Sequence, residues 1–170
     1  MAEKFDYFRK SVVITGKHSR LIDDMWIQGR IQDSFFKRLV DLYAIAAIIG
    51  LGVKRAVPED KNEDGKRTVQ VDQLTTKLEE LDTVMQMILL LDETSSLSVE
   101  DKINRAFKGP RTKEEFDSNV ELFNSYVRGG IEILHECLVQ RTIGIEDDYT
   151  DVKIGNIMAL FDNPLIPDIK

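Results

Sequence analysis

The stretch from Leu39 to Val53 constrains the fold more than any other part of the chain. It reads LVDLYAIAAIIGLGV, and Asp41 is its only charged residue. Fifteen residues are fewer than the roughly 20 that a helix needs to cross a bilayer, and basic residues bracket the run on both sides. We therefore expect the central, mostly buried helix of a soluble protein. Asp33 or Ser34 would cap its start, and Gly50 would lie near its end.

Length and composition suit one globular domain. The chain has 170 residues, of which 31% are charged and 42% hydrophobic, so neither general disorder nor a membrane class is favoured. Cys137 is the single cysteine, which excludes an internal disulfide and a cysteine-based metal cluster and indicates a reducing compartment. No apolar run near the N-terminus resembles a secretory signal. We expect a cytoplasmic protein with no membrane partner.

Apolar residues recur every three or four positions in several further segments, which predicts more helices. The expected helices cover residues 16–29, 72–91, 98–107, 112–138 and 151–161. Ser98 with Asp101 would cap the third of these, and a capping box of Thr112 with Glu115 would start the fourth. Residues 68–71 read as a short strand that needs residues 11–15 as its partner, so any sheet is small. The sequence thus predicts an all-α, single-domain bundle of five to six helices around the central apolar helix, with room for a minor β-hairpin. The domain would span residues 1–161, followed by an extended tail over 162–170.

Gly129 and Gly130 lie inside the predicted helix 112–138. Each glycine costs a helix about 1 kcal/mol relative to alanine, unless packing uses the missing side chain. Either the helix breaks at this pair, or another helix approaches it closely. Ala46 and Gly50, four residues apart on the central helix, offer a matching small surface. We favour the close crossing over the break.

Candidate metal and catalytic groups are few. His135, Glu136 and Cys137 are adjacent, but neighbouring side chains on a helix point in different directions and cannot converge on one ion. We interpret them as a semi-buried histidine, a surface glutamate and a core cysteine. His18 is interpreted as part of a solvated helix start. No phosphate loop, nucleophile elbow or HExxH spacing occurs, so we predict no catalytic residues, no metal site and no cofactor.

Asp41 is unusual because it interrupts the apolar helix. Lys37 and Arg38 precede it by four and three residues, the spacing at which helical side chains meet. We therefore expect a structural ion pair at the helix entrance, not a catalytic acid.

The strongest local charge lies in residues 102–113, KINRAFKGPRTK, which contain no acidic residue although the whole chain has a net charge of −7. Its basic residues are Lys102, Arg105, Lys108, Arg111 and Lys113. The first three recur by three and would share one side of a helix, where they could bind phosphates or an acidic partner. A solvated helix face is the simpler alternative and is weighed ahead of it. Lys54 and Arg55 would enlarge the basic surface if the fold brings them near.

The order FFKRLVDLYAIAAIIGLGVKR, a polar loop, an apolar helix and YVRGGIEILHE resembles a small family of accessory proteins associated with bacterial DNA phosphorothioation (Dnd) defence systems. The resemblance covers roughly residues 35–138 and rests on packing residues. It implies an accessory component of a multiprotein, DNA-directed complex. The basic insertion around 102–113 and the extension after Arg141 depart from the family pattern.

These observations lead to one expected function and one alternative. We expect a non-enzymatic helical adaptor subunit of a prokaryotic antiviral-defence or DNA-processing complex, whose partners are other protein subunits. The tail NPLIPDIK would be a docking peptide, because an extended apolar segment can lie in a partner's groove. The alternative is direct nucleic-acid binding through residues 102–113. An unrecognised enzyme ranks last.

Overall fold

The computed structural model describes residues 5–26, 34–62, 64–140 and 152–162. Within these ranges it contains seven helices and one two-stranded sheet. The elements in chain order are β1 Val12–Thr15, α1 Gly16–Met25, α2 Leu39–Gly52, β2 Lys66–Val69, α3 Val71–Thr76, α4 Leu78–Leu91, α5 Val99–Lys108, α6 Lys113–Leu138 and α7 Val152–Asp162. The predicted all-α bundle is confirmed, and its minor β element is a two-stranded sheet whose strands are separated in the chain by α1 and α2. Asp162 ends α7, and the rest of the expected tail lies outside the described residues.

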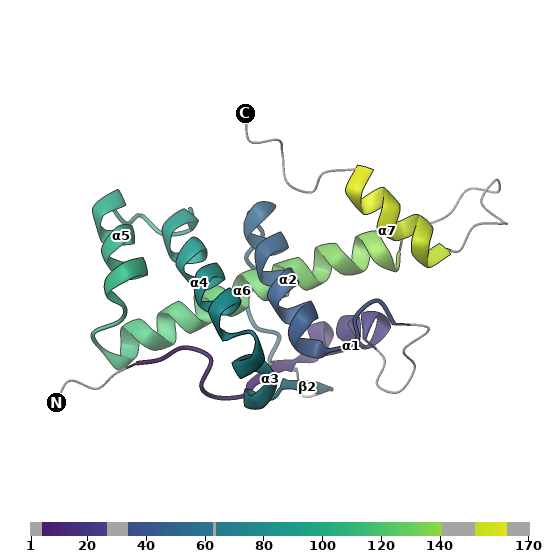
Figure 1. Ribbon diagram of the computed structural model, residues 1–170, viewed down its shortest axis with the longest axis horizontal. Coiled ribbons are helices and arrows are strands. Elements are labelled where there is room, and N and C mark those ends of the chain that lie inside the picture. The colour runs from purple at the N-terminus through teal and green to yellow at the C-terminus, as the bar shows by residue number, and fades with distance from the viewer. Residues whose placement is uncertain (1–4, 27–33, 63, 141–151, 163–170) are drawn as a thin grey trace.

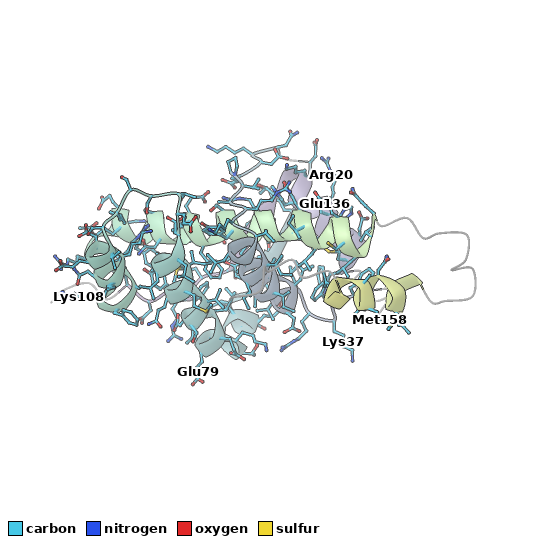
Figure 2. All side chains as sticks on the ribbon, turned by 90° about the horizontal axis from the view of Figure 1, so that it is seen from above. Arg20, Lys37, Glu79, Lys108, Glu136 and Met158 are labelled. Carbon is cyan, nitrogen blue, oxygen red and sulfur yellow. The ribbon has the colours of Figure 1, made fainter. Side chains whose placement is uncertain are left out.

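The long helix α6 forms the axis of the molecule (Figure 1). The helices α2, α4, α5 and α7 lie on one side of it, whereas α1 lies on the other. Figure 2 makes the division visible, since Arg20 of α1 extends from the side opposite to Glu79 and Met158. Each side of α6 therefore meets a different set of elements.

The crossing of α2 over α6 is the closest contact in the fold. A Cβ atom added to Gly130 would lie 1.8 Å from the backbone oxygen of Ala46, and one added to Gly50 would lie 1.9 Å from that of Tyr126. Gly129 meets the backbone oxygen of Arg55 in the same way, at 1.8 Å. The predicted close crossing is confirmed, and α6 continues through the glycine pair without a break.

The start of α2 differs from the prediction. The helix begins at Leu39, and the preceding residues fold back onto the end of α1. The amides of Phe35 and Phe36 donate to the backbone oxygen of Met25 at 2.9 and 3.3 Å, which is incompatible with helical bonding in this segment. Ser34 is buried there and does not cap α2, while Asp33 lies outside the described residues.

The expected ion pair at the entrance of α2 is present. Arg38 donates two hydrogen bonds to the Asp41 carboxylate, from Nε at 3.0 Å and from Nη2 at 2.9 Å. Asp41 therefore serves the structure of the helix start.

The predicted helix over residues 72–91 is in fact two helices, α3 and α4, which meet at a bend at Lys77. Thr75 and Thr76 donate their hydroxyls to the backbone oxygens of Val71 and Gln73. Such bonds compete with regular helical bonding and favour bending. The bend leaves α3 beside the sheet while α4 follows α2 along α6 (Figure 1).

The small sheet pairs β1 with β2 in antiparallel fashion, with Val12 opposite Val69 and Thr15 opposite Lys66. The predicted pairing is thus confirmed with shifted ends. Asp60, on the segment between α2 and β2, holds the first turn of α1 by accepting a 2.7 Å hydrogen bond from the amide of Lys17. The amide of Asn62 also donates to the Asp60 carboxylate, at 3.1 Å. The two backbone hydrogen bonds, from Lys17 and Asn62, outweigh the effect of burial and lower the pKa of the Asp60 carboxyl.

Two helix starts match their sequence signals. Ser98 accepts a hydrogen bond from the amide of Asp101 at the start of α5, and Thr112 accepts one from the amide of Glu115 at the start of α6. The carboxylate of Glu115 reaches back to the amide of Arg111, one residue before the position that a capping box uses.

Candidate functional site

The exposed face of α5 carries an apolar stripe. Val99, Ile103 and Phe107 follow each other by four residues and are 75%, 47% and 63% exposed. Residues four apart share one face of a helix, so these three form a continuous stripe. Ala106 is the buried residue of α5. The amphipathic helix α5 thus turns much of its apolar side to solvent.

Neighbouring helices extend this pattern. The helices α2, α4 and α7 lie on the same side of α6 as α5, and each exposes apolar side chains (Figure 1). We call the exposed apolar side chains of these four helices the outer apolar surface: Ile45, Ile48, Met87, Leu91, Val99, Ile103, Phe107, Ile154 and Met158. Isolated exposed apolar residues are ordinary, but three on one helix face, as in the stripe of α5, are typical of protein interaction surfaces.

The central helix is therefore less enclosed than expected. Ile45 and Ile48 of α2 are each 40% exposed, although Ala46 and Ala47 between them are fully buried. α2 has no charged residue after Asp41, so its solvent side is as apolar as its core side. The apolar run serves the core on one face and the outer apolar surface on the other.

The basic segment 102–113 is largely bonded within the protein. Lys102 donates to the backbone oxygen of Asp92 at 2.5 Å, and Arg105 donates to the side chain of Asn119 at 2.5 Å. Lys113 pairs with Asp117 at 2.7 Å. The Lys102 bond joins α5 to the end of α4, the Arg105 bond joins α5 to α6, and the Lys113 pair lies within α6. Together they reduce the positive charge available to a ligand.

Lys108 and Arg111 flank the turn between α5 and α6. Figure 2 shows the Lys108 side chain at the end of the molecule, directed away from it. Arg111 lines a cleft of about 790 Å³ between the two helices, together with the acidic side chains of Asp101, Glu114 and Glu115. The segment is therefore a mixed-charge region, not a continuous basic surface.

Lys54 and Arg55 are each bonded to an acidic side chain. Lys54 pairs with Glu93 at 2.7 Å at the end of α2. Arg55 donates to Glu132 of α6 at 2.5 Å and so belongs to the side of the molecule that holds α1. Both side chains are thus paired with glutamates of the chain.

Glu132 is the centre of a charged contact between α1 and α6. It is 8% exposed and bonds Lys17 at 2.7 Å, His18 at 3.1 Å and Arg55 at 2.5 Å. Burial alone would raise the pKa of this carboxyl, but the three hydrogen bonds outweigh burial and lower it. Glu132 is therefore held as a carboxylate that joins three segments of the chain.

The interpretation of His18 as solvated is wrong. Its side chain is completely buried in the contact between α1 and α6. Its Nε2 lies 3.1 Å from the Glu132 carboxylate, and its Nδ1 has no hydrogen-bond partner among the described residues. A reciprocal pair lies nearby, since Nε2 of His135 on α6 meets Asp24 of α1 at 2.7 Å. We call this contact the α1–α6 seam, defined by Lys17, His18, Asp24, Arg55, Glu132 and His135.

The other interpretations around His135 are met in part. His135 is buried beside Asp24, and Glu136 is exposed on the α1 side, as Figure 2 shows. Cys137 is half-buried, so it is not the core cysteine that was expected. In the described part of the chain no three histidine, cysteine or acidic side chains are arranged to hold a metal ion.

Sequence reasoning missed both main features for identifiable reasons. The stripe of α5 is visible as apolar residues at intervals of four, but the interleaved basic residues obscured it. The seam also has a signal: Arg128, Glu132 and His135 form a polar row beside the apolar row of α6. A charged row on an otherwise apolar helix face predicts a buried polar contact, although it cannot identify α1 as the partner.

Comparison of the chain with protein-family models, with curated proteins and with solved structures gave no match. The resemblance to Dnd-associated accessory proteins accordingly stays a prediction. Among the helices described, none combines the length and apolar character needed to span a membrane.

Proposed function

We propose that this protein is a non-enzymatic helical adaptor subunit of a prokaryotic antiviral-defence or DNA-processing complex, and that its outer apolar surface binds a partner subunit. One observation carries the proposal, namely the exposed stripe of Val99, Ile103 and Phe107. Full burial of one such side chain stabilises a complex by roughly 1.5–3 kcal/mol relative to leaving it exposed. A partner that covers the stripe therefore gains binding free energy from each apolar side chain that it buries.

The stripe is suited to an amphipathic helix of the partner. Its side chains repeat every four residues, which is the spacing of the ridges that interlock when two helices pack. Charged residues of α5 border the stripe, with Glu100 near its start and Lys108 at its end. Such a border lets opposite charges on the partner fix its direction.

The defence or DNA-processing context rests on the resemblance of residues 35–138 and not on the surface itself. It implies that the partner is encoded beside this protein. The adaptor and its context are therefore separable parts of the proposal.

Co-purification with the products of neighbouring genes tests the adaptor. We expect the wild-type protein to capture a partner, and Ile103→Glu with Phe107→Glu to abolish capture without changing the thermal melting curve. Val13→Glu is the matched control, because Val13 is 50% exposed on β1 and lies outside the outer apolar surface. Capture by the double variant, or a wild-type protein that captures none of these products, would contradict the proposal.

Direct nucleic-acid binding is the second candidate, and the orientation of Lys108 at the end of the molecule favours it (Figure 2). Affinity for a duplex should fall with salt, and Lys108→Ala with Arg111→Ala should reduce that salt dependence. Lys113→Ala is the control, since this lysine is paired with Asp117. Absence of binding at low salt would remove this candidate.

A further inference from the structure

The segment before β1 covers a pocket whose floor is aromatic. The pocket has a volume of about 450 Å³ and lies between this segment, α2, α4 and α6. Tyr43 of α2, Met85 of α4 and Phe123 of α6 line its floor, and Val120 of α6 lines its wall. Small-molecule sites are mostly apolar and measure roughly 300–1,000 Å³, so the pocket has the size and lining of a ligand site.

Phe8 shapes this pocket through a strained backbone. Its φ is +58°, in the left-handed region that bulky residues rarely adopt. The conformation turns its ring against Phe123, with 5.0 Å between the ring centroids and 67° between the planes. On the same wall Phe5 stacks on Phe116 at 5.6 Å. Strain of this kind costs about 1–3 kcal/mol and persists where packing enforces it, often at ligand sites.

The rim of the pocket is positively charged. Arg9, Lys10 and Lys113 line it together with one acidic residue, Asp6. Lys113 is paired with Asp117, so Arg9 and Lys10 against Asp6 give +2 and −1 and therefore a local charge of +1. The exposed side chains of Arg9 and Lys10 lie on the same segment as Phe8. A positive rim is notable in a chain whose net charge is −7.

An apolar floor below a cationic rim matches a ligand with an apolar body and a negatively charged head. We propose that this pocket binds an apolar carboxylate, of which a medium-chain fatty acid is the simplest example. The acyl chain contacts the partly exposed apolar side chains of the lining, Phe5, Phe116 and Val120, and the carboxylate meets Arg9 and Lys10 at the rim. The lining of this pocket shares no residue with the outer apolar surface.

Titration calorimetry of the full chain with decanoate tests the proposal. We expect saturable one-to-one binding of decanoate, weaker binding of decanol, which has the same chain without charge, and the weakest binding of decylammonium. Arg9→Ala with Lys10→Ala should weaken decanoate binding by roughly tenfold, since charged hydrogen bonds are lost, and leave decanol unchanged. Lys54→Ala with Lys108→Ala is the control for the same loss of charge elsewhere.

A second variant tests the pocket itself. Val120→Trp should fill the pocket and abolish decanoate binding while the helical circular dichroism spectrum is retained. If Val120→Trp does not fold, the comparison of decanoate with decanol on the Arg9 and Lys10 variant still decides. Equal binding of decanoate and decanol, unsaturable uptake, or undiminished decanoate binding by the rim variant would overturn the proposal.

Discussion

The two sides of α6 differ in which side chains they bury and which they expose. On the side of α1, charged groups are buried, and Glu132 bonds Lys17, His18 and Arg55. On the other side, apolar residues such as Phe107 remain exposed. A buried carboxylate with three partners completes its hydrogen bonding within the chain. An exposed apolar stripe, in contrast, gains free energy when a partner covers it. The seam is therefore a structural contact, and the outer apolar surface is the region open to a partner.

The largest expected effect concerns the crossing that both sides share. Gly130→Leu should lower the free energy of unfolding by at least about 3 kcal/mol, because the new side chain collides with the backbone of α2 at Ala46. Urea denaturation followed by circular dichroism measures the loss. Gln86→Leu, on the exposed side of α4, is the control and should change little. An unchanged midpoint for Gly130→Leu would mean that α2 and α6 are not in backbone contact.

The seam gives the next largest effect. Glu132→Ala should lower the free energy of unfolding by about 2–3 kcal/mol, since it leaves His18 without its carboxylate partner and Lys17 and Arg55 without theirs. Glu136→Ala is the matched control, because this glutamate is exposed and its distance to Arg55 is 3.7 Å. The control should cost less than about 1 kcal/mol. Equal losses in chemical denaturation would remove the distinction between a buried seam and a surface pair.

A smaller effect should appear with pH. Burial lowers the pKa of His18 below its ordinary value of 6.5, and the hydrogen bond to Glu132 opposes this in part; Lys17 and Arg128 add to the lowering. The folded protein then binds fewer protons than the unfolded chain, so stability is greatest above about pH 6.5 and declines as the pH falls below it.

Thermal melting between about pH 7.5 and 5 measures this decline, in a range above the ordinary titration of the Glu132 carboxyl. His18→Gln should flatten the profile. A variant profile with the same slope as the wild type would show that another group causes the decline.

The smallest effect is expected on the outer apolar surface. Phe107→Ala should change the free energy of unfolding by less than about 0.5 kcal/mol, because most of this ring is already in water. Val13→Ala provides a control of similar exposure. Loss of more than about 1.5 kcal/mol at Phe107 in urea denaturation would make the stripe part of the structure and would contradict its assignment as a free surface.

Local signals and size patterns in the sequence predicted much of the fold. Ser98 and Thr112 identify their helices because capping depends on residues within one turn. Gly50 and Gly130 identify the crossing because only missing side chains allow such an approach. The bend at Lys77 escaped prediction, since Leu74 and Leu81 point to the same core whether the helix is continuous or bent.

The surfaces were less predictable because they depend on distant residues. His18 is separated from Glu132 by 114 residues, and its own neighbours Lys17 and Ser19 suggest a solvated turn. The exposure of Phe107 depends on how α5 docks on α4, which no local pattern specifies. The basic segment was recognised as a charge pattern, but its bonding to Asp92 and Asn119 became visible only in three dimensions.

The α1–α6 seam also affects the order in which the chain folds during synthesis. His18 and Glu132 lie 114 residues apart, and Asp24 and His135 lie 111 apart, so α1 is synthesised long before its partner helix. On the ribosome, the imidazole of His18 cannot bond Glu132 until α6 has emerged. Contacts of such long sequence separation close late and slow folding. The helix α1 is thus made well before α6 and reaches its final contacts only after α6 is present.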